Sequence, residues 1–461
     1  MFRQQSAFRA IILPLLLAVL AGNGCRTNRP PVDFATRLDR LMSSLHASGG
    51  FNGALIVAHG TNILFEGGYG PANLGSRTPF TPDTPVDGAS LAKTMTAAAL
   101  LLLRDEGKVD LLRPVQHYLP EFPYPEVILR DLITHTAGLP DYDAFAAELA
   151  TGVSSNAKLL ALLQQHRPAL AFVPGTEFEY SSLGFDLAAL IIEGLCGKGY
   201  EQFLRERMFG PLDMTTAFVR PARFADWTGT RTEGFRWSEG RLEPLDVADN
   251  EGFYGGSNVY LSVRDLHRWN TSFLTQPVVA QATLRAGLEP FAYATGRQSR
   301  LGLLSWYVSE DGTQYWYSGH LQGFYSLAFR DTKTGHSIAY VSNANTPMWL
   351  RPLLVIHLRD LLAGREPGAL EPPARERIDV TDWPQLAGDY DVEGIGHVQL
   401  NAREGRLLCR GPNGIAYRVF PVAPDVLVVP GLDAWLWFTP ADGSRHGRLH
   451  WVRVVGEQTG R

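Results

Sequence analysis

Ser90 and Lys93 stand three residues apart at the head of an apolar stretch, SLAKTMTAAALLLL. At the start of a helix, positions i and i+3 share a face, so the Lys93 amine can reach the Ser90 hydroxyl. Apolar neighbours would partly desolvate the amine, which favours its neutral form and suits it to act as the base for a serine nucleophile. Amides at the helix N-terminus could hold an oxyanion. The pair indicates nucleophilic chemistry at Ser90.

The same spacing occurs again at Ser155 and Lys158, ahead of the run LLALLQQH. There the surroundings favour an ordinary helix start, with Ser155 as the N-cap and Lys158 as a solvated lysine. Short motifs of this kind match by chance, so context must separate the copies. The almost fully apolar run after Lys93 predicts a buried amine in the first copy alone.

The elements expected around Ser90 are strands at both ends of the chain segment, with helices between them. This order predicts an α+β domain in which an antiparallel sheet is covered by an inserted helical region. The expected elements are an amphipathic helix at 34–49, a hairpin around Gly60-Thr61-Asn62 within 53–70, helices from about 90 to 270, strands at 302–319, 324–331 and 336–343, and a helix at 349–362.

A second, smaller domain is expected at the C-terminus. Residues 364–383 are rich in proline and charge and short of core residues, which is typical of a linker. Beyond it, seven short alternating runs punctuated by Gly, Pro and Asn predict a small all-β domain at 384–461, either a lipocalin-like barrel or a sandwich. None of its residues forms a recognisable catalytic group.

Several collinear segments carry a family resemblance that runs from about residue 50 to 362. In their order the chain resembles the class C β-lactamases, the penicillin-binding-protein-like D-Ala-D-Ala carboxypeptidases and the family VIII esterases. The resemblance implies a β-lactamase/transpeptidase-like fold and a serine hydrolase. The segments are GYGPANL, the helix that begins at Ser90, LRDLITHTAGLPDY, VPGTEFEYSSLGFDLAALIIEGLCGKGYEQFLRERMFGPLDM and GGSNVYLSVRDLHRW.

The resemblance also implies roles for individual residues. Ser90 would be the nucleophile, Lys93 its base, and Tyr180 the group that moves the proton to and from the leaving group. A phenol can do this at neutral pH only beside a positive charge, which Lys93 would supply. His135, in the segment THTAGLPD, resembles a loop residue that shapes the site, and we expect it to be a structural, hydrogen-bonding histidine.

The second motif departs from the family pattern. The family has Y-x-N, whose Asn orients an amide carbonyl of the substrate, whereas this chain has Tyr180-Ser181-Ser182. Ser182 is expected to contact the substrate, but it has a shorter reach and one polar atom where Asn has two groups.

The third motif is expected at Tyr317-Ser318-Gly319. The family has K-T-G or H-x-G on an inner strand, followed after three residues by Gly-Phe, and the segment YSGHLQGF fits this layout. Tyr317, Ser318 and Gly319 are therefore predicted to bind substrate, and the backbone amides of Ser90 and His320 to form the oxyanion hole. Tyr317 replaces the usual cation with a hydroxyl and an aromatic face, which suits an ester or apolar acyl group better than a free carboxylate.

A literal K-T-G also occurs, at Lys333-Thr334-Gly335. It falls between two runs of strand character and follows Asp331, and these residue types are typical of a turn. We expect a hairpin turn at this position.

The same residues allow other interpretations of fold and function. An α/β-hydrolase with a nucleophile elbow at Ser90 would need Gly at position 92 and a strand just before the serine, but position 92 is Ala and TPFTPDTPVDG is a poor strand. A D,D-peptidase, a D-aminopeptidase or a β-lactamase are alternatives within the family. A catalytically weak cell-envelope binding module is the alternative of another class.

The N-terminus predicts export. Residues 1–25 have Arg3 and Arg9 before an apolar run and then small residues, as in a signal peptide. Cys25 resembles a lipoprotein attachment cysteine, so a periplasmic or cell-envelope location, with a possible lipid anchor, is expected. The net charge of -5 and the absence of a basic stripe argue against nucleic acid as a partner. No cofactor is implied, and the cysteines offer no metal-ligand spacing.

The assignment of the third motif predicts the behaviour of two variants. Lys333→Ala should leave activity nearly unchanged because a turn residue does not meet the substrate, whereas Tyr317→Ala should alter substrate preference. Initial rates on a panel of esters and a cephalosporin measure both effects. Loss of acyl-enzyme formation in Lys333→Ala would mean that the third motif lies at Lys333 instead.

Overall fold

The computed structural model describes most of the chain after residue 32. The predicted signal peptide, Cys25 and most of the predicted linker lie outside the described residues. No helix of the described part is both long enough and apolar enough to cross a bilayer. The described ranges are 33–229, 231–367, 370–371, 383–393, 395–403, 405–423, 425–439, 449–453 and 456–460.

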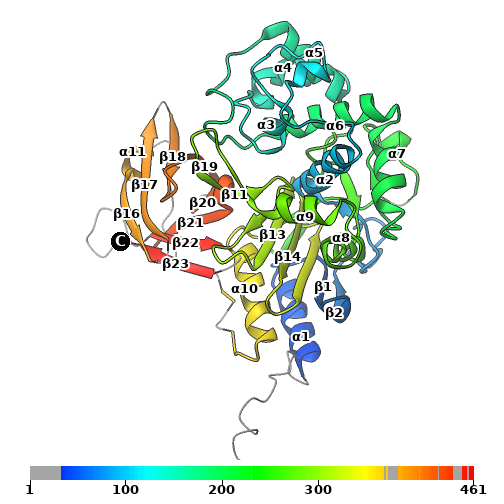
Figure 1. Cartoon of the computed structure of the whole chain (residues 1–461). Coiled ribbons are helices and arrows are strands. Elements are labelled where there is room, and N and C mark those ends of the chain that lie inside the picture. Colours follow the sequence, from blue (N-terminus) through cyan, green and yellow to red (C-terminus); the bar gives the residue numbers. More distant parts are fainter. Residues whose placement is uncertain are drawn as a thin grey trace, which may run out of the picture.

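The first domain is built on an eight-stranded antiparallel sheet in the order β10-β11-β12-β13-β14-β15-β1-β2. The N-terminal hairpin β1-β2 joins the strands that come last in the domain, because β1 pairs with β15. This is the predicted α+β arrangement, seen in Figure 1 with blue strands beside yellow ones. The strands are β1 (Gly53–His59), β2 (Asn62–Tyr69), β10 (Pro290–Ala292), β11 (Gln298–Gly302), β12 (Tyr307–Val308), β13 (Gln314–Leu321), β14 (Phe324–Asp331) and β15 (His336–Ser342).

The K-T-G triplet is a turn, as the sequence predicted. β14 ends at Asp331 and β15 begins at His336. Asp331 accepts hydrogen bonds from the backbone amides of Lys333 and Thr334, at 2.9 and 3.0 Å, which closes the turn. Gly335 has φ of 74°, a value that glycine adopts without strain. The Lys333 side chain is exposed.

Helices cover both faces of the sheet. Consecutive residues of a strand point to opposite faces, and β14 shows what each face meets. The Phe329 ring lies 5.2 Å from the Arg359 guanidinium of α10, while Arg330 donates to Asn270 of α8 at 3.3 Å. The helices are α1 (Phe34–Ala47), α2 (Ala92–Asp105), α3 (Leu129–Ile133), α4 (Ala146–Leu149), α5 (Asn156–His166), α6 (Leu183–Cys196), α7 (Tyr200–Leu204), α8 (Val263–Thr275), α9 (Gln281–Leu288) and α10 (Leu350–Leu362).

Helix α2 is the central helix of the domain. Every residue from Ala92 to Leu101 is buried, as expected of a helix with apolar residues all around it. It packs against α6 and is tied to α8 by the Trp269 indole, which donates to the Thr94 hydroxyl at 3.0 Å. The helix therefore holds its first turn, which carries Lys93, inside the protein.

Short strands accompany the helical region, and one precedes Ser90. Strand β3 has two residues and pairs antiparallel with β9 in a small sheet of its own. The nucleophile elbow of an α/β-hydrolase sits on a strand of a large parallel sheet, so the fold excludes that alternative. These short strands are β3 (Val86–Asp87), β4 (Ser154–Ser155), β5 (Phe218–Val219), β6 (Phe235–Ser238), β7 (Arg241–Pro244), β8 (Glu251–Gly252) and β9 (Val259–Leu261).

The C-terminal domain is a closed antiparallel barrel in which each strand pairs with the next in sequence. Closure brings Val392 of the first strand opposite Gly460 of the last. Seven of the eight strands correspond to the runs predicted from the sequence. The last strand, GEQTG, has no apolar residue and was not predicted. Helix α11 (Trp383–Leu386) precedes the strands β16 (Gly388–Val392), β17 (Gly396–Arg403), β18 (Arg406–Arg410), β19 (Ala416–Ala423), β20 (Val426–Val429), β21 (Ala434–Phe438), β22 (Leu449–Arg453) and β23 (Gly456–Gly460).

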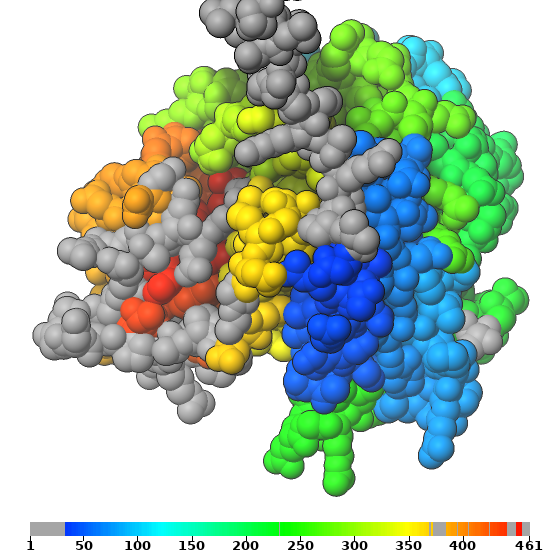
Figure 2. Space-filling model, turned by 90° about the horizontal axis from the view of Figure 1, so that it is seen from below, coloured from blue at the N-terminus to red at the C-terminus, as the bar shows by residue number. Residues whose placement is uncertain are grey.

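The two domains lie side by side. In Figure 1 the orange and red barrel stands next to β13 and α10. Figure 2 shows α10 between α1 and the barrel. Contacts between the domains include an ion pair between Arg418 and Glu179 at 3.2 Å and a hydrogen bond from Arg297 to the Gly414 carbonyl at 2.8 Å. The barrel thus meets the sheet domain through specific polar contacts.

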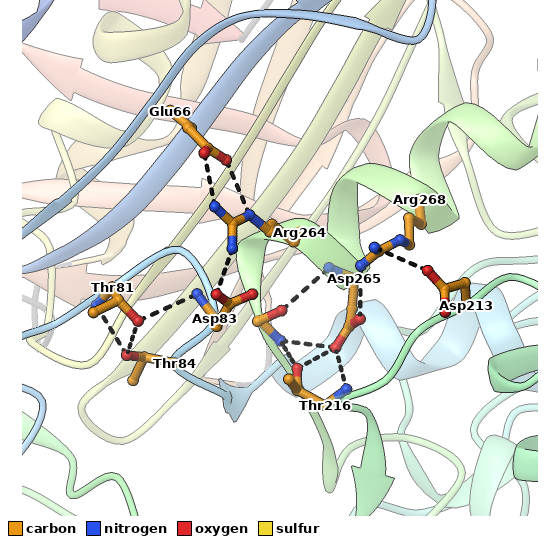
Figure 3. Close-up of polar contacts among 10 residues, drawn as sticks. Glu66, Thr81, Asp83, Thr84, Asp213, Thr216, Arg264, Asp265 and Arg268 are labelled. Carbon is orange, nitrogen blue, oxygen red and sulfur yellow. Dashed lines mark hydrogen bonds and ion pairs between the residues drawn. The ribbon is translucent and has the colours of Figure 1, made fainter.

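A network of ion pairs links α8 to β2 at the surface (Figure 3). Arg264 binds Glu66 with two hydrogen bonds, at 2.7 and 3.0 Å, and also contacts Asp83. Beside it, Asp265 completes a capping box with Ser262 at the start of α8. Asp265 is buried, whereas the Arg264 network is partly exposed.

Removing the exposed part of this network should have a small effect. Arg264→Ala is expected to lower the free energy of unfolding by about 1 kcal/mol or less, because solvent and salt screen partly exposed ion pairs. Urea denaturation at low and high salt measures the difference, which should shrink as salt is added. A loss that stays the same in high salt would mean that packing of the arginine stem, and not its charge, is what stabilises α8.

Candidate active site

The turn that carries Ser90 is strained and held in place from several sides. Ala89 has φ of 50°, in the left-handed region that a residue with a Cβ seldom adopts. The Asp87 carboxylate accepts a hydrogen bond from the Ala89 amide at 2.7 Å, and the Val259 carbonyl accepts one from Gly88 at 2.8 Å. A 3-10 turn (Ala89–Leu91) then leads into α2. These hydrogen bonds hold the strained turn and so fix the position of the Ser90 backbone.

Three predicted residues meet at the Ser90 hydroxyl. The Lys93 amine lies 3.2 Å from Ser90 Oγ, and the Tyr180 hydroxyl lies 2.7 Å from the same atom. The Lys93 Nζ is 5.0 Å from the centre of the Tyr180 ring, so the amine also faces the phenol. Lys93 is fully buried, as the apolar helix predicted. A serine oxygen thus has two proton-accepting or proton-donating groups within hydrogen-bond reach.

The Lys93 amine is fixed by neutral oxygens. Besides Ser90 it donates to Ser182 Oγ at 2.9 Å and to the Gly256 carbonyl at 2.7 Å. All three hydrogens of an ammonium group therefore have acceptors, and none of these acceptors is a carboxylate. Ser182, predicted to contact substrate, is thus placed against Lys93. That it also touches substrate stays a prediction.

Behind Gly256 lies a buried carboxyl group that the sequence analysis did not single out. Asp186, one turn after Ser182 in α6, accepts a hydrogen bond from the Gly256 amide at 3.0 Å and another from the Tyr142 hydroxyl. Burial raises the pKa of Asp186 to about 7, against the hydrogen bonds from Tyr142 and Gly256 and the charge of Lys93, which lower it. Asp186 supports the Gly256 segment from the side opposite to Lys93.

His135 supports Tyr180, in agreement with the structural role that the sequence predicted. Its Nδ1 accepts a hydrogen bond from the Ser181 amide at 3.0 Å, and its ring stacks on the Tyr180 ring with centres 4.5 Å apart. Burial lowers the pKa of His135 well below its usual value, and the charge of Lys93 lowers it further. The ring is therefore neutral at physiological pH and positions the tyrosine.

Strand β13 passes directly beside the Ser90 turn. A Cβ added at Gly319 would lie 2.2 Å from the Gly88 carbonyl and 2.8 Å from the Ser90 amide, so only glycine allows this approach. Next to it, the Ser326 hydroxyl donates to the Gly88 carbonyl at 2.6 Å. The predicted third motif is thus brought to the nucleophile, and His320 follows it at the cavity.

A cavity of about 220 Å³ opens at Ser90. Of the predicted residues it is lined by Ser90, Tyr180, Tyr317, Ser318 and His320, but not by Lys93, Ser182 or Gly319. The remaining lining residues are Tyr307, Tyr325, Met348, Arg351, Val422, Val428, Pro430, Asp433 and Trp435.

None of these remaining residues was predicted from the sequence. Arg351 comes from α10, and its guanidinium donates to the Thr346 carbonyl at 2.9 Å and to Asn345 at 2.7 Å. The barrel contributes Val422, Val428, Pro430, Asp433 and Trp435, and the first domain contributes Tyr307, Tyr325 and Met348 besides Arg351. No local pattern marks these residues, because the barrel segment VLVVPGLDAWLWF is typical of any strand, turn and strand.

Among the described residues, no group of three or more His, Cys, Asp or Glu side chains is arranged to hold a metal ion. The chemistry described above is that of hydroxyl, amine and phenol groups.

The close approach at Gly319 gives a test of the geometry. Gly319→Ala should push β13 away from the Ser90 turn and slow the reaction of Ser90 with a fluorophosphonate by roughly 10- to 100-fold, since a misplaced oxyanion donor costs that much. Stopped-time labelling measures the rate.

A matched control is Gly194→Ala in α6, where nothing lies within 4 Å of the added Cβ. Its labelling rate should equal that of the unmodified chain. Equal rates in Gly319→Ala and Gly194→Ala would contradict the role given to the approach of β13.

Comparisons with known proteins agree with this fold. The family model described as Beta-lactamase matches residues 38–362. Penicillin-binding protein 4* of Bacillus subtilis (strain 168) is 24% identical over 423 residues, which cover 87% of this chain and 93% of that protein. The chain is similar in both domains to proteins of this kind, since the match extends beyond the first domain.

Two solved structures share the fold. The octameric penicillin-binding protein homologue from Pyrococcus abyssi matches with a TM-score of 0.62 at 19% identity, over 92% of this chain and 99% of its own. EstCE1, a hydrolase with promiscuous acyltransferase activity, matches with a TM-score of 0.57 at 17% identity, over 72% of this chain and 98% of its own. With the Ser90 site in place and the family model covering most of the chain, the protein belongs to the beta-lactamase family of serine hydrolases.

Proposed function

We propose that this chain is an exported serine hydrolase that works through an acyl-enzyme on Ser90. The observation that carries the proposal is the position of Ser90 Oγ, within 3.2 Å of the Lys93 amine and 2.7 Å of the Tyr180 hydroxyl. A serine is a weak nucleophile until a neighbouring base takes its proton. Both partners are buried or half-buried and held by further contacts, so they are pre-positioned for this transfer.

In the first half of the reaction, Ser90 Oγ attacks the carbonyl carbon while its proton passes to Lys93 or Tyr180. The bond to the leaving group then breaks, and Tyr180 returns a proton to the leaving atom. In the second half, water attacks the acyl group, loses a proton to the same pair, and releases the acid and Ser90. The backbone amides of Ser90 and His320 would hold the oxyanion in both halves.

We propose ester hydrolysis as the main activity. The third-motif position carries Tyr317, whose burial and contact with Tyr180 raise its pKa well above the usual value and keep it neutral. The second-motif position carries Ser182, which binds Lys93. Neither offers the cation or the amide that would grip a β-lactam or peptide.

A second candidate is a peptidase or β-lactamase activity. Arg351 of α10 favours it, because its buried guanidinium lines the cavity. It could donate hydrogen bonds to a substrate carboxylate in place of the third motif. A relative of this chain, Penicillin-binding protein 4* of Bacillus subtilis, is named for binding a β-lactam. Arg351 and Tyr317 thus favour different substrates, and direct comparison of rates decides between them.

Export and anchoring are part of the proposal. The apolar run and small residues of the first 25 positions support a signal peptide, and Cys25 supports lipid attachment at the envelope. A catalytically weak binding module remains the alternative to enzyme activity.

The test of the proposed function uses a fluorophosphonate and two substrates. The unmodified chain should be labelled and Ser90→Ala should not, because the label bonds to the nucleophile. Nitrophenyl acetate should be turned over with a kcat/KM at least about tenfold above that for a cephalosporin, a ratio that corresponds to roughly 1.4 kcal/mol of transition-state binding.

Two results would contradict the proposal in different ways. Equal labelling of Ser90→Ala, or no labelling of the unmodified chain, would favour another nucleophile or the binding module. Efficient cephalosporin hydrolysis without esterase activity would leave the nucleophile in place and replace the substrate class.

A further inference from the structure

The barrel reaches into the cavity through one short segment. Between β20 and β21, a 3-10 turn (Pro430–Leu432) brings the chain against β12 and β13 of the first domain. The Tyr307 hydroxyl donates to the Pro430 carbonyl, and the Trp316 indole donates to Asp433 Oδ2. Both donors are buried side chains of the sheet. The segment is therefore docked by hydrogen bonds to the wall that also carries Tyr317.

Gly431 lets this segment lie close to its neighbours. A Cβ added there would fall 2.2 Å from the Tyr417 ring and 2.8 Å from the Phe178 ring, one from each domain. The next residues place Asp433 at the cavity with φ of 46°, in the left-handed region that Asp and Asn adopt more readily than most residues. The backbone thus places a carboxylate in the lining of the cavity that opens at Ser90.

The Asp433 carboxylate lacks a charged partner. It is 5% exposed and lines the same cavity as Ser90. Among the described residues Oδ2 accepts from Trp316, while Oδ1 accepts no hydrogen bond and no basic nitrogen lies within ion-pair distance. The charge of Arg453 acts on Asp433 from beyond that distance, and Arg453 is paired with Glu310 at 2.9 Å. A buried carboxylate without a partner is unfavourable unless a ligand supplies one.

A chain of contacts leads from Tyr180 to the segment that carries Asp433. In the proposed mechanism Tyr180 gives its proton to the leaving atom, so that atom lies next to Tyr180. Tyr180 borders the same cavity as Tyr317, and the Tyr317 ring stacks on Tyr307 at 5.6 Å. Tyr307 in turn holds the segment that carries Asp433. The leaving group would therefore meet the barrel.

We propose that Asp433 binds a protonated amine on the leaving group of the substrate, so that the barrel selects esters of amino alcohols or similar cationic leaving groups. This inference rests on the proposed acyl-enzyme function and adds the chemical class of the leaving group. An ammonium group would donate to Oδ1 and supply a charged partner among buried side chains, where such a bond is strong.

The raised pKa of the Asp433 carboxyl group agrees with a site whose cationic partner is supplied by a ligand. Burial raises its pKa to about 7, against the hydrogen bond from Trp316 and the charge of Arg453, which lower it. A bound cation would favour the ionised carboxylate and offset part of the effect of burial.

Arg351 faces the same cavity with the opposite charge. Its guanidinium stacks on the Tyr325 ring at 4.3 Å and is bound to the Thr346 carbonyl and to Asn345. It is thus held on the α10 side, away from the segment that carries Asp433. The two charges make the cavity dipolar, and an anionic leaving group serves as the counter-test.

The experiment compares leaving groups of equal shape and different charge. The full chain is given 2-(dimethylamino)ethyl thioacetate, a tertiary ammonium at neutral pH, and 3-methylbutyl thioacetate, in which CH replaces NH⁺. The released thiol is followed with a disulfide reagent. The unmodified chain should show a higher kcat/KM for the cationic thioester, and Asp433→Asn should lower the cationic-to-neutral ratio by about tenfold, the scale of one charge-assisted hydrogen bond.

Asn keeps the shape of Asp433, its tolerance of the left-handed backbone and an acceptor for Trp316, so the variant tests charge. The matched control is Asp391→Asn, an exposed barrel carboxylate that lies outside the cavity lining and removes the same charge. Its ratio should equal that of the unmodified chain. The anionic thioester of 3-mercaptopropanoate should gain relative to the neutral one in Asp433→Asn.

The outcomes separate the two proposals. If the fluorophosphonate labels Ser90 but the ratio shows no cationic preference, or Asp433→Asn retains it, this inference is overturned and the hydrolase stands. If the unmodified chain is not labelled, the proposed function fails first. Should Asp433→Asn not fold, inhibition of the unmodified chain decides: 2-(dimethylamino)ethanol should inhibit nitrophenyl acetate turnover more strongly than 3-methylbutanol, and equal inhibition would refute the proposal.

Discussion

The site depends on a buried lysine whose amine is held by neutral oxygens. Lys93 is fully buried, and its three acceptors are a serine that would be the nucleophile, a second serine and a backbone carbonyl. None of these acceptors is a carboxylate, so the amine is positioned by hydrogen bonds and not by an ion pair. The burial of α2 on all sides and the packing of α6 against it maintain that position.

Around the lysine, each functional group is supported by a second one. His135 stacks on Tyr180 and accepts from the residue that follows it, and Asp186 holds the amide of Gly256. The Ser90 turn is held by Asp87 despite the unfavourable φ of Ala89. These supports are buried, so they limit the movement of the reacting groups without meeting the substrate. A reactive geometry needs this rigidity, because small displacements of reacting atoms slow the reaction greatly.

The literal motifs in the chain were uninformative without their surroundings. Two serines precede a lysine by three residues, yet Ser155 caps a helix and accepts from the Lys158 amide, while Ser90 meets a buried amine. The K-T-G triplet is a turn, and Gly319, in a segment without K-T-G, approaches the nucleophile. The apolar run after Lys93 and the Gly-Phe marker after the third motif separated these cases, because burial and strand order leave traces in local sequence. No local pattern predicted the contact of Ser182 with Lys93. In the structure the Ser182 hydroxyl accepts a hydrogen bond from the Lys93 amine.

The sequence by itself determined what depends on neighbours along the chain: the helix that bears Ser90 and Lys93 on one face, the hairpin turn at Lys333, the alternation of most barrel strands and the resemblance that brought Tyr180 to notice. Only the tertiary structure decided which distant groups meet. Arg351 and Asp433 reach the cavity because α10 packs on the sheet and the barrel docks on β12 and β13. The physical reason is that helix and strand periodicity reflects local geometry, whereas the wall of a cavity is set by the packing of elements far apart in the chain.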